Sequence, residues 1–269
     1  MRDQLRRFLP VCLLAVACLY TYKLEIPETH THAAAGITGI NATTQSGAIS
    51  ATASNDTVIT VGVLKHAYGR DQADAEKYIA NVVYSDTVVG DELSIKAEMP
   101  SGSRPYGASF SITAPESTDL SLSTTNGDVS VTSMVGSITA NTTNGNIELT
   151  GTAGTASVST TNGRLNVIVH SGAFYGATTN GAVDCDLAAL GVAEDVGLAT
   201  TNGKVTLLLP DNISAVIEAT NTNGLITIHD FTVTYETQTE HHVRARIGSG
   251  ASSITVTTTN GDVVVRRRS

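Results

Sequence analysis

A short motif recurs along this chain and limits what the chain can fold into. Thr-Thr-Asn-Gly or a close variant occurs seven times, with its glycine at positions 127, 145, 163, 181, 203, 224 and 261. The first three steps are equal in length, and further glycines at 136, 154 and 172 divide these steps in half. Turns therefore recur about every nine residues, a regularity that is typical of repeat proteins.

Apolar residues occupy fixed positions around each motif. Seven and five residues before the glycine, and two and four after it, stand mainly Val, Ile, Leu and Ala, while Ser, Thr and charged residues fill the positions between. This period-2 alternation predicts one strand on each side of the motif, with the apolar side chains facing inward. Around Gly145 the four positions hold Ile138, Ala140, Ile147 and Leu149.

The motif itself is interpreted as a structural corner. Asn tolerates a left-handed backbone and Gly carries no Cβ, so the chain could reverse in the same way each time. In stacked coils the Asn amides would form a hydrogen-bonded ladder, buried from water. The predicted corner residues are Asn126, Gly127, Asn144, Gly145, Asn162, Gly163, Asn180, Gly181, Asn202, Gly203, Asn223, Gly224, Asn260 and Gly261.

Two all-β architectures fit this pattern. An antiparallel meander with Asn-Gly hairpins is one, because that dipeptide is a strong hairpin signal. A parallel β-solenoid with about 18 residues per coil is the other. The solenoid is favoured because only alternate turns carry the motif. Irregular steps after Gly181 indicate excursions, the longest over residues 229–250, where alternation predicts a protruding or edge-covering hairpin.

Residues 36–119 are expected to open the solenoid and cap its first edge. Strands are predicted at Thr57–Leu64, Asn81–Val89, Glu92–Glu98 and Gly107–Thr113, with a short helix at Asp71–Ile79. The repeats then occupy 120–269, and residues 18–35 are taken as a linker. Three arginines, Arg266 to Arg268, are expected to discourage pairing at the far edge.

The N-terminus has the layout of a secretory signal. Arginines precede a short apolar run that ends in Ala15-Val16-Ala17, followed by Cys18. Residues 1–17 are therefore assigned to a signal peptide, with Cys18 as the candidate for lipidation. Free secretion and an uncleaved anchor remain as alternatives. All three place the chain outside the cytoplasm, in the periplasm or at the cell surface, in contact with a membrane only through this anchor.

Composition and motifs argue against several kinds of chemistry. The formal net charge is −9, which opposes binding to nucleic acid. The residue after each motif glycine is acidic at Asp128 and Asp262 alone, so a calcium-binding nonapeptide roll is nearly excluded. The seven histidines show no metal-ligand spacing with cysteine, Cys185 occupies an inward slot, and no catalytic motif stands out. No cofactor, metal site or catalytic residue is predicted.

The combined features resemble a known family. The stretches VITVGVLKHAYGRDQADAEKYI, DELSIKAEMP and SITAPESTDLSLSTTNGDVSV, followed by successive T-T-N-G coils, are similar to the bacterial putative adhesin domain of unknown function, also called Toastrack. The resemblance covers about residues 36–268. It implies a single-stranded right-handed β-solenoid, an envelope location with links to envelope stress, and no catalytic residues. The long excursion departs from the family pattern.

The sequence thus favours a non-enzymatic envelope protein for adhesion, binding or scaffolding, with an unidentified envelope protein or glycan as its partner. A polysaccharide-acting enzyme of the cell surface is the main alternative. An ice-binding protein that uses outward threonines such as Thr125, Thr143, Thr161 and Thr179 is a further one. These threonines are expected to satisfy hydrogen bonds at the corner instead, and their regularity is expected to break after Gly181.

Overall fold

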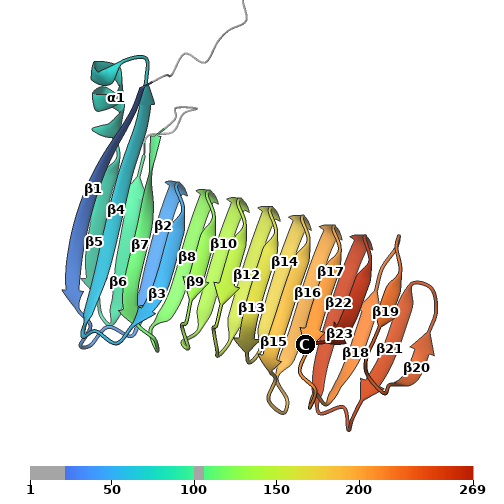
Figure 1. Cartoon of the computed structure of the whole chain (residues 1–269). Coiled ribbons are helices and arrows are strands. Elements are labelled where there is room, and N and C mark those ends of the chain that lie inside the picture. Colours follow the sequence, from blue (N-terminus) through green and yellow to red (C-terminus); the bar gives the residue numbers. More distant parts are fainter. Residues whose placement is uncertain (1–21, 100–105, 269) are drawn as a thin grey trace, which may run out of the picture.

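The chain forms two long β-sheets that face each other (Figure 1). The structure, a computed structural model, describes residues 22–99 and 106–268. Over these residues one sheet has 11 strands and the other has 12. Most neighbouring strands run parallel, so the all-β class is confirmed and the arrangement is consistent with a flattened β-solenoid.

The strands of the 11-stranded sheet follow a spatial order that differs from the chain order. From one edge to the other they are β1 (Tyr22–Ala33), β4 (Val58–Gly69), β7 (Tyr106–Pro115), β3 (Ile49–Ser54), β9 (Val129–Thr132), β11 (Ile147–Thr150), β13 (Leu165–Ser171), β15 (Val183–Ala189), β17 (Val205–Leu209), β23 (Val263–Arg267) and β19 (Ile226–Ile228).

The 12-stranded sheet supplies the other half of each coil. In the same direction its strands are β5 (Val83–Val89), β6 (Glu92–Glu98), β2 (Gly39–Ser46), β8 (Asp119–Asn126), β10 (Ile138–Asn144), β12 (Ala156–Asn162), β14 (Phe174–Asn180), β16 (Asp195–Asn202), β22 (Ser252–Asn260), β18 (Ala215–Thr220), β21 (His242–Ile247) and β20 (Thr234–Gln238).

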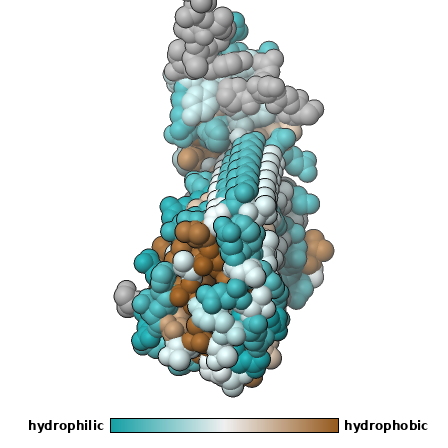
Figure 2. Space-filling model, turned by 90° about the vertical axis from the view of Figure 1, so that its right-hand side faces the viewer, coloured by the Kyte–Doolittle hydropathy of each residue, from teal (hydrophilic) through white to brown (hydrophobic). Residues whose placement is uncertain are grey.

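The pairing register follows the sequence repeat. In β10 and β12, Ile138 lies beside Ala156 and Asn144 beside Asn162, in each case the equivalent residue of the next repeat. Equivalent residues therefore stack in straight rows, and Figure 2 shows such rows running along the molecule. A meander is excluded for this region, because its strands would pair antiparallel.

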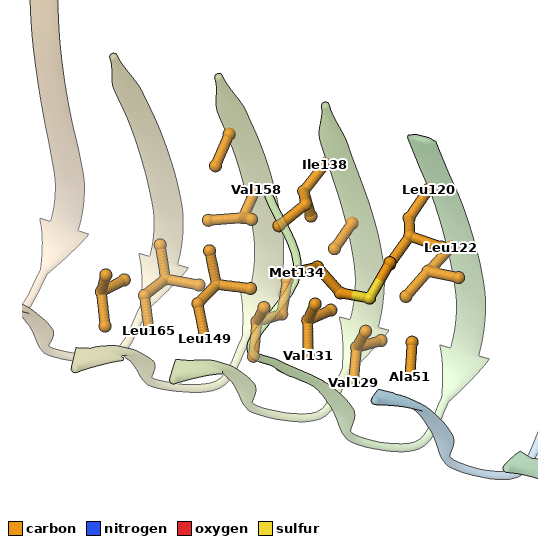
Figure 3. Packing of buried hydrophobic residues seen from close by; sticks show 14 of the residues in the cluster. Ala51, Leu120, Leu122, Val129, Val131, Met134, Ile138, Leu149, Val158 and Leu165 are labelled. Carbon is orange, nitrogen blue, oxygen red and sulfur yellow. The ribbon is translucent and has the colours of Figure 1, made fainter. Parts of the chain in front are cut away.

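The core lies between the sheets and is built mainly from aliphatic side chains. In β8 and β9 the inward residues Leu120, Leu122, Val129 and Val131 are at most 3% exposed. Figure 3 shows such side chains from the two sheets pointing toward one another, with Met134 among them. Each coil buries the apolar face of the next, so an isolated coil would lack a core.

The coils do not stack in chain order at either end. Strands β22 and β23, from the last repeat in the sequence, lie between β16–β17 and β18–β19. Likewise β2 and β3 lie between β6–β7 and β8–β9. The motif stays in register across the insertion, since Asn202 pairs with Asn260 and an isolated bridge joins Asn260 to Asn223.

The opening segment has the predicted elements with shifted ends, and one that was missed. The helix α1 spans Gln72–Ile79 after its N-cap Asp71, whose side chain accepts a hydrogen bond from the Asp74 N–H at 2.9 Å. The expected linker over 18–35 is wrong for much of its length, because β1 pairs antiparallel with β4 along its whole length. Its alternation of charged and apolar residues around Pro27 suits an exposed edge strand.

The long excursion forms a hairpin at the other end. Strands β20 and β21 pair antiparallel, and β21 pairs antiparallel with β18, so the hairpin extends and covers the edge of the 12-stranded sheet. The expected role of the terminal arginines at the edge is wrong. Arg266 and Arg267 belong to β23, which lies between β17 and β19.

Candidate binding surface

The first threonine of the motif faces inward and holds the corner of the preceding coil, except in the copy at 221–224, where this position is Asn221. The Thr142 hydroxyl donates to the carbonyl oxygen of Gly127 at 2.9 Å, and Thr160 donates to that of Gly145 at the same distance. Five further threonines make the equivalent bond, namely Thr44, Thr124, Thr178, Thr200 and Thr258. This role was assigned from the sequence to the outward threonines, and that assignment is wrong because the bonds come from the residue before them.

The motif asparagines form a continuous chain of side-chain hydrogen bonds. Asn144 Nδ2 donates to Asn126 Oδ1 at 2.8 Å, and Asn162 Nδ2 donates to Asn144 Oδ1 at 2.8 Å. The chain continues through Asn180, Asn202, Asn260 and Asn223. All of these asparagines are exposed, so the expectation that the ladder is buried from water is wrong. It lies on the rim, where water can replace a lost amide.

The motif glycines are required by close packing. A Cβ on Gly145 would lie 2.0 Å from the carbonyl oxygen of Gly127, and the same conflict recurs at Gly163, Gly181, Gly203 and Gly261. Gly224 alone among the seven has a left-handed backbone, with φ of 132°. The motif asparagines are absent from the residues with positive φ. The left-handed corner inferred from the sequence is therefore wrong at most copies, because the neighbouring coil is what excludes a side chain.

The second threonine of each motif faces solvent on the outer face of the 12-stranded sheet. Thr125, Thr143, Thr161, Thr179, Thr201 and Thr259 are all exposed. The register keeps them in one row, because the residues on either side of them pair in step: Thr178 pairs with Thr200, and Asn180 with Asn202. The expected break after Gly181 is wrong, since the extra residues form loops away from this corner. A row of hydroxyl groups thus follows the strands.

A shallow hollow of about 330 Å³ interrupts this polar face. Tyr175 from β14 is 45% exposed beside it, and Gly197 from β16 leaves room for the ring. A Cβ on Gly197 would lie 3.0 Å from Tyr175 Cδ1, so the ring leans over the neighbouring strand. Hydroxyl-bearing side chains and small residues complete the lining, namely Ser157, Ser159, Ala177, Ala199, Thr255 and Thr257.

This hollow was not found from the sequence. Tyr175 and Gly197 occupy equivalent outward positions in neighbouring coils, where four other copies have Ser or Thr and one has Glu218. The departure of two adjacent coils from the repeat was the available signal. Its chemistry is an exposed aromatic ring bordered by hydroxyl groups, which offers an apolar surface together with hydrogen-bond donors and acceptors. No carboxylate or imidazole is among the residues that line it.

Cys185, His241 and His242 lie outside the hollow. Cys185 is 2% exposed in its inward slot, and burial raises the pKa of its thiol, so it is held as an inert thiol. His241 Nδ1 bonds to Asn221 Oδ1 at 2.9 Å, and His242 Nε2 lies 3.3 Å from a Glu218 oxygen. Over the described residues, no group of three or more His, Cys, Asp or Glu side chains is placed to hold a metal ion.

A comparison with protein-family models tests the family resemblance that the repeat suggested. The family model described as Toastrack DUF4097 matches residues 22–266. The chain belongs to this family. The Toastrack match includes the opening segment, the repeats and most of the final coil, and therefore treats β1 and the excursion as parts of one unit. No match was found among curated proteins.

Several solved structures align with about as much of this chain as the family model does. A putative adhesin from Bacteroides fragilis has 13% identity and a TM-score of 0.48, and covers 89% of this chain and 97% of its own. A putative cell adhesion protein from Clostridium sporogenes has 13% identity and a TM-score of 0.40, with 91% and 100% covered. A putative lipid binding protein from Parabacteroides distasonis has 10% identity and a TM-score of 0.35, with 89% and 96% covered.

The predicted signal peptide and Cys18 lie outside the described residues. Within residues 22–99 and 106–268, no helix is both long enough and apolar enough to cross a membrane.

Proposed function

We propose that this Toastrack protein is a non-enzymatic binding module of the cell envelope that presents the outer face of its 12-stranded sheet to a glycan. In this proposal the chain lies outside the cytoplasm and is held at a membrane by lipid on Cys18. Its architecture is a right-handed solenoid with about 18 residues per coil, opened by a cap that includes β1 together with residues 36–119. An adhesive or scaffolding role, with a link to envelope stress, would follow from the ligand it holds.

The observation that supports the proposal is the hollow at Tyr175. A sugar ring has an apolar face and a rim of hydroxyl groups, and the hollow offers an exposed ring beside serine and threonine hydroxyls. The surrounding strands are fixed by backbone pairing on both sides, so the site is formed before ligand arrives. A preformed site spends little free energy on ordering, which favours recognition by a few modest contacts.

The test is a glycan array probed with the purified full chain. We expect binding to bacterial surface glycans that falls at least tenfold in Tyr175→Ala. Tyr235→Ala is the matched control, because it removes a ring of similar exposure, 41%, from the hairpin. Gly197→Ala is expected to weaken binding as well, since the new methyl group would displace the Tyr175 ring. Binding that is unchanged in Tyr175→Ala, or a chain that captures no glycan, would contradict the proposal.

The alternative enzyme reading predicts turnover on the same array. No Asp, Glu, His, Lys or Cys side chain lines the hollow, so among the groups that commonly transfer protons in catalysis it offers the Tyr175 hydroxyl alone. Shortened or released glycan products would nevertheless establish the enzyme and remove the binding module as the leading function.

One observation supports ice binding as a second candidate. The exposed threonines repeat in register over six coils, with the spacing of about 4.8 Å that separates paired strands. A thermal-hysteresis signal that is lost in Thr161→Lys would favour this candidate over glycan binding. We rank it second because Tyr175, Ala177 and Ala199 interrupt the neighbouring rows.

A further inference from the structure

Three segments that depart from the repeat meet at one rim of the 12-stranded sheet. They are the loop between β15 and β16, the loop between β17 and β18, and the turn between β21 and β22. The Ala193 N–H of the first loop donates to the carbonyl oxygen of Ala251 in the turn at 3.2 Å. The hydroxyl oxygens of Ser214 in the second loop and Ser249 in the turn lie 2.8 Å apart. The irregular segments therefore hold one another in place.

These segments border a pocket of about 430 Å³ on the outer face of the sheet, which we call the rim pocket. Its charged and hydroxyl side chains come from four neighbouring strands, namely Asp195 on β16, Ser253 on β22, Glu218 on β18 and Arg244 on β21. Ala193 lines it from the first loop with a left-handed backbone, φ 62°, a strained conformation that persists only where the surroundings hold it. Its bond to Ala251 supplies that hold.

The rim pocket adjoins the hollow at Tyr175. Asp195 and Gly197 are successive outward residues of β16, and Ser253 and Thr255 are successive outward residues of β22. The first residue of each pair lines the rim pocket and the second lines the hollow. The two cavities are therefore neighbouring parts of one surface.

One row of outward positions leads from the hollow to the far side of the rim pocket. Tyr175 pairs with Gly197, and Gly197 with Thr255. Thr255 pairs with Glu218, and Glu218 with Arg244. At about 4.8 Å per strand, the two ends of this row lie about 19 Å apart. A single sugar cannot span that distance, whereas a linear chain of several sugars that lies across the strands can.

The charges in the rim pocket favour a positively charged group on the ligand. Arg244 is already held by two carboxylates, with Nη1 2.9 Å from a Glu218 oxygen and Nε 2.7 Å from a Glu236 oxygen. The Asp195 carboxylate is exposed and makes no ion pair within the part of the chain that the structure describes. The pocket thus has a carboxylate without a cation, while its guanidinium group already has two carboxylates.

This arrangement ranks the sugars that could enter. A sugar that covers Asp195 displaces water from the carboxylate and must supply hydrogen-bond donors in its place. An ammonium group supplies donors and opposes the negative charge, whereas hydroxyl groups supply donors alone. A carboxylate on the sugar would face Asp195 and Glu218 without a free cation. Amino sugars are therefore favoured over neutral sugars, and neutral sugars over acidic ones.

We propose that the rim pocket is a second subsite of the glycan surface and that the ligand is a linear oligosaccharide of amino sugars. The chain lies across the strands, with one unit against the Tyr175 ring and another unit placing its free amine at Asp195. This rests on the glycan binding proposed for the hollow. It narrows the ligand from glycans in general to chains that reach both cavities and carry positive charge.

Isothermal titration of the purified full chain with oligosaccharides of defined length tests the second subsite. The probes are β-1,4-linked glucosamine chains of two to six units, N-acetylglucosamine chains of the same lengths, and galacturonic acid chains, at a pH that keeps the amines protonated. We expect the glucosamine hexamer to bind at least tenfold more tightly than the dimer. It should also bind at least fivefold more tightly than the acetylated hexamer, with the galacturonic acid chains weakest.

Asp195→Asn should remove the preference for glucosamine over N-acetylglucosamine and leave the affinity for the acetylated hexamer within twofold. Glu92→Gln is the matched control, because it removes one negative charge from an exposed outward position of β6 in the same sheet, and it should keep the preference. An equal loss in the two variants would mean that the overall charge attracts the amines, and would overturn the proposal.

The remaining outcomes separate this subsite from the hollow. Equal affinities for dimer and hexamer, or for the glucosamine and acetylated hexamers, would overturn the second subsite. If Tyr175→Ala still weakens the binding of either hexamer in that case, the glycan function of the hollow stands. A chain that binds none of the three series also overturns the second subsite, and the glycan array then decides the proposed function separately.

Discussion

A methyl group at a motif glycine should destabilise the whole array. In Gly145→Ala the new Cβ would lie 2.0 Å from the Gly127 oxygen and 2.5 Å from its carbon, so the two coils must separate locally. That separation strains the bond from the Gly127 N–H to the Asn144 carbonyl, now 3.0 Å, and the bond from Thr142 to the Gly127 carbonyl, now 2.9 Å.

The magnitude follows from these contacts. Overpacking a tight site costs about 1–3 kcal/mol, and weakening two hydrogen bonds adds about 1 kcal/mol, so we expect a loss of about 3 kcal/mol in the free energy of unfolding. Gly39→Ala is the control, because its Cβ would meet atoms no nearer than 3.9 Å. That change should stay within about 1 kcal/mol of the parent.

Urea unfolding followed by circular dichroism measures both variants. The midpoint of Gly145→Ala should fall clearly below that of Gly39→Ala at an unchanged slope. If the two midpoints are equal, the close approach between coils does not limit the residue at the corner, and our explanation of the repeated glycine is wrong.

Three further predictions concern charge, pH and anchoring. Arg164→Ala removes an ion pair with Asp184 of 2.6 Å at an exposed position, and should change the free energy of unfolding by less than about 1 kcal/mol, measured by the same urea assay. Burial lowers the pKa of His170 from its ordinary value of 6.5, so the folded protein holds it neutral. The contribution of the neutral His170 side chain to the free energy of unfolding is complete above pH 6.5 and is lost as the pH falls through the lowered pKa. The reason is that His170 binds a proton at a higher pH in the unfolded chain than in the folded one. His170→Gln should show a smaller loss of stability on acidification from pH 7 to 5 than the parent, and an equal loss would contradict this assignment. A fatty-acid probe should label the protein in bacteria and fail to label Cys18→Ser, whereas an unlabelled parent that runs as soluble protein would refute lipidation.

The repeat could be predicted from the sequence because every coil has the same corner motif and the same alternation of apolar and polar residues. Alternation placed residues such as Leu122, Val131 and Leu149 inward, and each is at most 1% exposed. The helix start at Asp71 and the strand Glu92–Glu98 were equally accessible, since capping and alternation are local signals.

The stacking order could not be read in this way. Every coil carries the same corner, so Asn202 would match Asn223 as well as it matches Asn260, and the sequence does not say which of the two is its neighbour. The inward and outward roles of the two threonines, and the reason for Gly145, depend on contacts with the preceding coil. The hollow at Tyr175 likewise exists because Gly197, which belongs to the next coil, lies beside it in space.

The central claim is that the repeated corner is a scaffold and that recognition takes place on the outer face. Asn144→Ala tests it most directly, because it removes two ladder bonds, to Asn126 and from Asn162, at an exposed position away from Tyr175. We measure its urea midpoint and its affinity for the best glycan from the array. The account predicts a loss of about 1 kcal/mol in stability and an affinity within twofold of the parent. Unchanged stability with abolished binding would contradict it, and would make the asparagine ladder the recognition site.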